Sequence, residues 1–127
     1  SIPDKVDGVI NIAGMQSLGM SCVPYLPTSM VIYGSKKDTT VPPLEIIAFD
    51  GYFYEPMPNT VDEWKNAFNC SKKEVEEINL PSRITKTYYS DCDDNITITS
   101  LLDHENTHDW PKPYKWGLDL LFSSLLN

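Results

Sequence analysis

Two short apolar runs, each closed by a glycine, constrain the fold of this chain more than any other feature of its sequence. Residues 8–14 (Gly-Val-Ile-Asn-Ile-Ala-Gly) and 29–34 (Ser-Met-Val-Ile-Tyr-Gly) are almost continuously apolar. A strand that is buried on both faces of a parallel sheet has this near-continuous apolar character, whereas a half-exposed strand alternates. The sequence therefore predicts two buried strands, joined by a turn-rich connection that contains Pro24 and Pro27.

The middle of the chain carries a helix signal. Thr60 and Glu63 have the spacing of a capping box, and Trp64 and Phe68 lie one turn apart on a single helical face. These features predict a helix over residues 61–69 with Thr60 as its N-cap.

Three further elements are predicted toward the C-terminus. Residues 72–77 are highly charged and are predicted to form a solvated surface turn or a short helix. Residues 84–89 and 95–101 alternate or are β-branched, which predicts an antiparallel hairpin. Apolar residues at helical spacing predict an amphipathic helix over residues 115–126.

The length of 127 residues fits a single domain, residues 1–127. The order of its elements predicts the α/β class, with a doubly wound, mostly parallel sheet, an antiparallel hairpin and a C-terminal helix. With 10 Lys+Arg against 18 Asp+Glu, the net charge is −8, so we expect no nucleic-acid partner. No apolar run is long enough for a membrane span, and no residue spacing indicates a metal site or a cofactor.

The cysteines and sequons favour an oxidising, extracellular setting. Cys22, Cys70 and Cys92 are an odd number, and the favoured pairing is Cys70 with Cys92, which leaves Cys22 outside the bridge. The alternative is three reduced thiols buried as small apolar residues. Asn69 and Asn95 each begin an N-x-S/T sequon and are candidate glycosylation sites.

Two polar loops contain the candidate catalytic residues. The loop at 34–43 leaves the second predicted strand and contains Asp38, and the loop at 102–111 follows the hairpin and contains His104 and His108. Sheets of the α/β class place their functional residues at the carboxyl ends of strands. An Asp that precedes a His in this way has the order of the last two members of a Ser–Asp–His triad.

The amino-acid sequences of these loops resemble those of a known family. Residues 30–42 are similar to the strand followed by His-Gly-x-x-Asp-x-x-Val-Pro that marks the feruloyl esterase and polyhydroxybutyrate-depolymerase-like branch of the α/β-hydrolases. The resemblance continues in order over nearly all of the chain, at residues 2–6, Trp64, Asn69-Cys70, Tyr89, Cys92 and 107–111 (Thr-His-Asp-Trp-Pro).

The resemblance implies the C-terminal part of a secreted serine esterase that acts on esters of plant cell-wall polysaccharides or on polyesters. In this reading Asp38 orients the imidazole of His108, which removes the proton from a serine that attacks the ester. His104 is then a surface or supporting residue. Trp110 either packs the histidine loop or forms a wall of a substrate pocket for an aromatic acid.

Three departures from the family pattern matter. Tyr33 stands where the family has a histidine, residues 105–107 replace a run of glycines, and the chain contains no Gly-x-Ser-x-Gly. The nearest pentapeptide, residues 15–19, surrounds Ser17 but begins with Met15. We therefore expect this chain to supply the Asp and the His without the serine, and to be inactive in isolation. It would pair with a missing N-terminal half, or self-associate through the exposed edge of strand 8–14.

Two other interpretations stay open. One is a non-catalytic, secreted domain of the same ancestry that binds a glycan or a protein through aromatic residues, namely Tyr52, Tyr54, Trp110 and Trp116. The other is a small unrelated α/β domain whose resemblance to the esterases is accidental.

Overall fold

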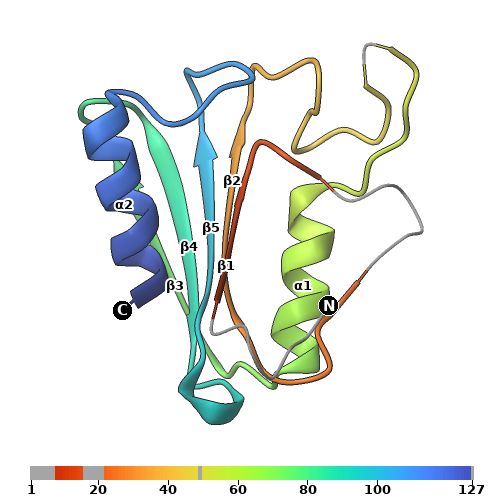
Figure 1. The fold of residues 1–127 in the computed structure, drawn as a ribbon, viewed down its shortest axis with the longest axis vertical. Helices are drawn as coiled ribbons and strands as arrows, with labels where there is room; N and C mark the ends of the chain where they lie inside the picture. The colour runs from red at the N-terminus through yellow and green to blue at the C-terminus, as the bar shows by residue number, and fades with distance from the viewer. Residues whose placement is uncertain (1–7, 16–21, 49, 127) are drawn as a thin grey trace.

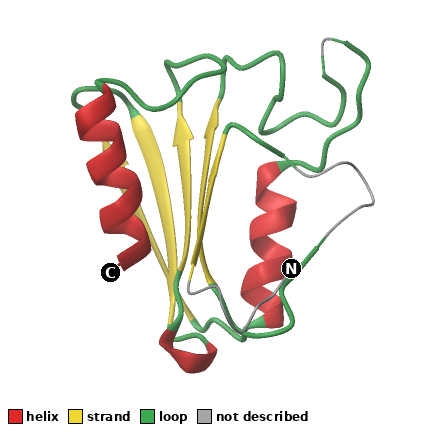
Figure 2. Cartoon of the chain, in the orientation of Figure 1, coloured by secondary structure: helices red, strands yellow, loops and turns green. Residues whose placement is uncertain are grey.

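A computed structural model describes residues 8–15, 22–48 and 50–126, and its strands form one mixed sheet (Figure 1). The strands are β1 (Gly8–Ile12), β2 (Ser29–Ser35), β3 (Lys72–Ile78), β4 (Ile84–Ser90) and β5 (Ile98–Asp103), in the order β1-β2-β5-β4-β3. The helices α1 (Met57–Ala67) and α2 (Tyr114–Leu126) lie on opposite sides of the sheet, as Figure 2 shows. A short 3₁₀ turn, η2 (Asp93–Asn95), lies between β4 and β5.

The predicted fold class was wrong. The β1–β2 and β2–β5 pairs are parallel, but β5–β4 and β4–β3 are antiparallel, so the sheet is not mostly parallel. A doubly wound sheet needs a crossover, usually a helix, between successive parallel strands. Here β3, β4 and β5 follow one another as an antiparallel meander instead, and β5 returns to lie beside β2.

Each face of the sheet has its own apolar core. Met30 and Ile32 of β2 pack in the cluster beneath α1, whereas Val31 and Tyr33 pack in the cluster beneath α2. This alternation arises because successive strand residues point to opposite faces. The near-continuous apolar run of β2 therefore reflects burial on both faces, as predicted.

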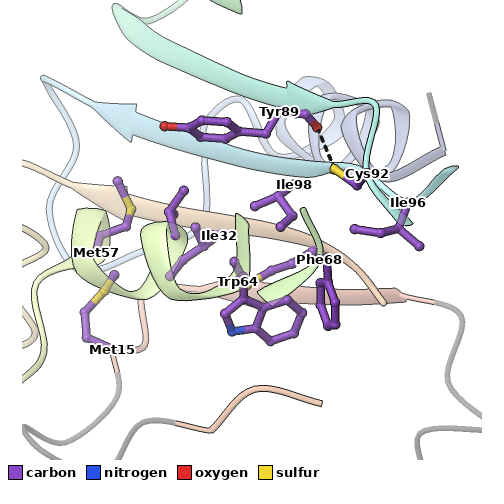
Figure 3. Packing of buried hydrophobic residues seen from close by; sticks show 11 residues of the cluster. Met15, Ile32, Met57, Trp64, Phe68, Tyr89, Cys92, Ile96 and Ile98 are labelled. Atoms are coloured by element: carbon purple, nitrogen blue, oxygen red, sulfur yellow. Dashed lines mark hydrogen bonds between the residues drawn. The ribbon is translucent and has the colours of Figure 1, made fainter. Parts of the chain in front are cut away.

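The helix α1 contributes one buried stripe to the first core. Trp64 and Phe68 pack edge to face, with ring centroids 5.9 Å apart. Figure 3 shows both side chains within the surrounding cluster. The predicted start of this helix was wrong, because it begins one turn earlier, at Met57, with Pro58 in its first turn. A proline fits there because the N–H groups in the first turn of a helix have no acceptor within the helix, so the absence of one N–H group loses no hydrogen bond. Thr60 is consequently a buried residue inside the helix and not its N-cap.

The charged segment at residues 72–77 was also predicted wrongly, since it forms the strand β3. This strand pairs with β4 along its whole length, from Lys72 opposite Ser90 to Ile78 opposite Ile84. All of its residues except Ile78 are exposed, so main-chain hydrogen bonds to β4 hold it and burial contributes little. A charged strand suits the edge of a sheet because it discourages pairing with another chain.

The strand β1 was predicted to be buried on both faces, but it is half-buried along its length and lies at the edge of the sheet. Two other elements agree with the sequence. The predicted hairpin is confirmed as the antiparallel pair β4–β5, and the C-terminal helix is confirmed as α2. The predicted disulfide between Cys70 and Cys92 is also confirmed, and it joins the end of α1 to the connection before β5. None of the helices in the described part of the chain is long and apolar enough to cross a membrane.

Candidate functional site

Two neighbouring parallel strands bring the candidate loops together. Ser35 at the end of β2 lies opposite Asp103 at the end of β5, and the N–H of Lys36 donates to the carbonyl of Asp103 over 2.7 Å. The loops that leave these two strands therefore start at the same edge of the sheet (Figure 1). Asp38 lies in the first loop and His108 in the second, so residues 70 positions apart in sequence become neighbours.

Asp38 and His108 form a hydrogen-bonded pair. Nδ1 of His108 lies 2.7 Å from Oδ2 of Asp38. The other carboxylate oxygen, Oδ1, accepts the N–H groups of Thr40 at 2.8 Å and Val41 at 2.9 Å. The Asp38 side chain is fully buried, and these two bonds from its own loop fix the orientation of its carboxylate. This is an Asx-type turn in which one oxygen holds the loop and the other is left for the imidazole.

The imidazole of His108 connects this buried carboxylate to solvent. Its side chain is 46% exposed. An ionised carboxylate is an acceptor without a donor, so Nδ1 carries the proton and Nε2 of the neutral ring is the free base. No hydrogen bond within residues 8–15, 22–48 and 50–126 engages Nε2. The pair can therefore accept a proton from a group that approaches Nε2.

A proline packed on a glycine ends each of the two loops. A Cβ on Gly34 would lie 2.7 Å from Cβ of Pro43, and one on Gly117 would lie 2.3 Å from the carbonyl oxygen of Pro111. Both prolines are almost completely buried. Since only glycine permits such close approach, these contacts fix where each loop returns to the body of the domain.

A second buried carboxylate, Asp103, holds the histidine loop. Its Oδ1 accepts the hydroxyl of Ser82 at 2.9 Å and the N–H groups of Glu105 at 2.9 Å and Asn106 at 3.1 Å. Its Oδ2 accepts the phenol of Tyr33 at 2.7 Å. Burial raises the pKa of Tyr33 above its ordinary value, so the phenol stays neutral and remains a donor.

Asn106 closes this network over the loop. Its amide nitrogen donates to the Tyr33 hydroxyl at 3.1 Å and to the carbonyl of Trp110 at 2.9 Å. Sequence reasoning missed the role of Asp103, Tyr33 and Asn106. No local pattern in the sequence indicates these contacts, because they join β2 to a loop about 70 residues further along the chain.

The structure separates the other predicted residues from this pair. His104 places Nε2 2.7 Å from the hydroxyl of Thr85 on β4, and its Nδ1 is buried without a hydrogen-bond partner among the described residues. Trp110 is 47% exposed and lines a hollow of about 200 Å³ between β1 and α2, with Ile10 and Phe122 among its neighbours. Asp38 and His108 are not part of that hollow.

The remaining candidate residues lie at the surface or in the packing. Asn69 and Asn95 are exposed, and the amide of Asn69 donates to Asp93 at 2.9 Å. Trp116 packs against the core under α2 and Tyr54 against the core under α1. Ser17 and residues 2–6 lie outside the described residues. In the described part of the chain, no group of three or more His, Cys, Asp or Glu side chains could hold a metal ion.

Comparison with protein-family models, with curated proteins and with solved structures returned no match. A functional assignment therefore rests on the Asp38–His108 geometry and on the resemblance carried by the two loops.

Proposed function

We propose that this chain supplies the acid–base pair of a carboxylic-ester hydrolase of the Ser–His–Asp type. The observation that carries the proposal is the 2.7 Å contact between a fully buried Asp38 carboxylate and Nδ1 of a half-exposed His108. A buried carboxylate on one ring nitrogen fixes the tautomer and stabilises the imidazolium that forms during proton transfer. The resemblance of both loops to feruloyl esterase-type enzymes supports the same chemistry.

Each residue has a defined role in this proposal. Nε2 of His108 takes the proton from a serine hydroxyl while the serine oxygen attacks the ester carbonyl. Asp38 keeps Nδ1 protonated and offsets the positive charge of the ring. The imidazolium then protonates the departing alkoxide, and a water molecule repeats the sequence to release the acid.

The serine in this proposal comes from outside the described residues. No described serine hydroxyl is hydrogen-bonded to His108, and Ser17 lies in a stretch that is not described. A parallel strand added beside β1 would end at the same edge of the sheet as β2 and β5. We place the nucleophile after such a strand, which would also cover the edge of β1.

The substrate class and the location follow from the resemblance. We propose esters of plant cell-wall polysaccharides or polyesters as substrates, and a secreted protein as the setting. The Cys70–Cys92 disulfide is compatible with an oxidising compartment, and the exposed Asn69 and Asn95 are accessible for glycosylation.

The test compares the two histidines of one loop. Ester hydrolysis is measured with p-nitrophenyl acetate, for this chain and for a chain extended at its N-terminus from the coding sequence. We expect no turnover by the 127-residue chain and turnover by the extended one. In the extended chain, His108→Ala should reduce kcat by about 10³-fold or more. His104→Ala is the matched control and should retain most of the activity, since His104 contacts Thr85 and not Asp38.

Undiminished hydrolysis by the His108→Ala variant would remove His108 from the mechanism. An equal loss in both histidine variants would indicate that the loop folds poorly, and the proposal would then lose its support from this pair.

A further inference from the structure

A cavity adjoins Asp38 on the side of its own loop. It has a volume of about 350 Å³, and Asp38 and Thr39 form part of its wall. The rest of the wall is mainly apolar and consists of Pro42, Pro43, Leu44, Ile47 and Ala48. Lys36 and Glu45, one of each charge, complete the lining. A volume in this range and a mostly apolar wall are typical of small-molecule sites.

A short hairpin stands beside this cavity. Ile47 and Phe53 form an isolated antiparallel bridge, and two further main-chain hydrogen bonds join Ala48 to Tyr52 at 2.8 Å and Tyr54 to Ile46 at 2.7 Å. We call residues 46–48 and 50–54 the flap. In Figure 1 it belongs to the long connection that projects beyond the sheet between β2 and α1.

The flap exposes apolar side chains that the core does not use. Ile46 is 45% exposed, Ile47 57%, Tyr52 66% and Phe53 54%. Single exposed apolar residues are ordinary on a protein surface, but several on one hairpin beside a cavity mark a binding surface. Ile47 belongs to both features, because it is exposed on the flap and lines the cavity.

The charges of the lining favour an uncharged occupant. The whole chain carries −8, which disfavours an anionic ligand such as a free carboxylate. Within the cavity wall, Lys36 offsets Glu45, and Asp38 has its carboxylate engaged by His108 and two backbone N–H groups. A neutral ester therefore suits this wall better than its charged acid product, which would help the product to leave.

We propose that the cavity and the flap bind the larger apolar moiety of a neutral ester, a group of at least the size of a six-membered ring. The proposal deepens the function proposed above and rests on it for the identity of the reaction, although binding itself needs neither His108 nor a serine. Ile47 and Ala48 of the flap form one part of the wall around the bound group, and Asp38, the hydrogen-bond partner of His108, forms another.

Binding is measured first on the 127-residue chain, by NMR chemical-shift mapping with methyl benzoate. Methyl acetate at equal concentration is the comparison probe. We expect methyl benzoate to shift the resonances of Thr39, Leu44 and Ile47, and methyl acetate to leave them nearly unchanged.

The matched variants are Ile47→Ser and Val75→Ser. Both side chains are aliphatic, β-branched and similarly exposed, at 57% and 58%, but Val75 lies on the edge strand β3. Ile47→Ser should weaken methyl benzoate binding by about tenfold, because it removes apolar contact from the wall. Val75→Ser should leave binding unchanged.

Three outcomes would overturn this inference. The first is a shift pattern centred on the hollow at Trp110 and Phe122. The second is unchanged methyl benzoate binding in Ile47→Ser. The third is concentration-dependent self-association of the chain that Ile47→Ser abolishes, which would make a second copy the occupant of the flap.

Kinetics of the extended chain separate this inference from the proposed function. Ile47→Ser should raise KM for methyl benzoate more than KM for methyl acetate, whereas His108→Ala should lower kcat for both. If Ile47→Ser left KM unchanged but His108→Ala still lowered kcat, the binding site would be overturned and the mechanism would stand. If Ile47→Ser raised KM but His108→Ala left kcat unchanged, the mechanism would be overturned and the binding site would stand.

Discussion

Two buried carboxylates lie at the ends of neighbouring strands and differ in what they contact. Asp38 is 2% exposed and follows β2, and Asp103 is 1% exposed and ends β5. The oxygens of Asp103 accept four hydrogen bonds, all from groups that hold the loop in place. Those of Asp38 accept two such bonds and then one from His108, whose side chain reaches solvent.

This difference shows that burial and hydrogen bonding do not by themselves identify a functional carboxylate. Both aspartates satisfy the requirement that a buried charge be paired or fully hydrogen-bonded. The distinguishing property is the exposure of the partner, because a proton can be exchanged with a substrate only through a group that the substrate can contact. By this criterion Asp38 is the carboxylate that fits the reaction site we propose, and Asp103 belongs to the framework that holds the neighbouring loop.

The largest expected effect is on catalysis by Asp38→Asn. The Asn oxygen can still accept the N–H groups of Thr40 and Val41, so the loop should keep its shape. The Asn amide would instead donate to Nδ1 of His108, which forces the proton onto Nε2 and leaves that nitrogen unable to act as a base. We expect kcat of the extended chain to fall by about 10⁴-fold with little change in stability.

The isolated chain provides a check, because we expect a downfield NMR resonance from the Nδ1 proton of His108 that disappears in Asp38→Asn. If the variant kept near-normal kcat, Asp38 would be a framework residue like Asp103, and the two carboxylates would not differ in function.

The next effect is on stability, from Asp103→Ala. This change leaves the Tyr33 phenol, the Ser82 hydroxyl and two backbone N–H groups without their acceptor. We expect the free energy of unfolding to fall by about 3 kcal/mol, as measured by urea denaturation. Asp38→Asn should lose less than about 1 kcal/mol in the same assay, because its acceptor oxygen remains. Equal losses would show that both aspartates serve the fold alone.

Elements whose burial shows in the spacing of their apolar residues were predicted well from the sequence, and the charged strand and the sheet topology were not. The β4–β5 pair and the helix α2 depend on alternation and helical spacing within a few residues, which the sequence displays directly. The strand β3 could not be predicted this way, because its exposed Lys and Glu side chains carry no burial signal and its pairing with β4 is a main-chain property. The wrong fold class has the same cause. Because β3 was predicted to be a turn or a short helix, one of the two antiparallel pairs of the β3–β4–β5 meander was missed.

The candidate site shows a similar division. Asp38 and His108 were identified from the amino-acid sequences of their loops, and the two side chains are hydrogen-bonded in the structure. The role of Asp103 was missed because a carboxylate at the end of a strand gives no hint of its donors, which come from Tyr33, Ser82 and its own loop.

A smaller effect is expected from Tyr33→Phe, which removes one hydroxyl from the framework. The phenol donates to Asp103 and accepts from Asn106 and from Ser35, the last at 3.3 Å. We expect a loss of about 1 to 2 kcal/mol in stability. Asn106 would keep its bond to the carbonyl of Trp110, so the loop should loosen without unfolding. As a positioning residue, Tyr33 should affect kcat several-fold with little change in KM.

The pH dependence of stability distinguishes this role from simple packing. Burial raises the pKa of Tyr33 above its ordinary value of 10.0, so its contribution to stability is complete below pH 10.0 and is lost as the pH rises toward the higher folded pKa. The Tyr33→Phe variant should lack this alkaline loss. Tyr25→Phe, at a side chain that is 90% exposed, is the control and should resemble the parent protein.

The smallest effect concerns Asp109, a third carboxylate that lies in the same loop but at the surface. A hydrogen bond from Lys112 at 2.9 Å, aided by the N–H of Trp110 at 2.7 Å, holds the pKa of Asp109 below its ordinary 3.8. Lys112→Ala should move that pKa up toward 3.8 when the carboxyl carbon is titrated by NMR, and Tyr114→Phe should move it less, because the phenol is a weaker cause.

The lowered pKa of Asp109 also predicts a pH dependence of stability. It stabilises the fold at pH values above the pKa of the unfolded state, and this contribution is lost as the pH falls through the folded pKa. Because water screens an exposed pair, neither variant should change stability measurably at neutral pH. A loss comparable to that of Asp103→Ala would mean that exposure does not separate framework carboxylates from surface ones in this loop.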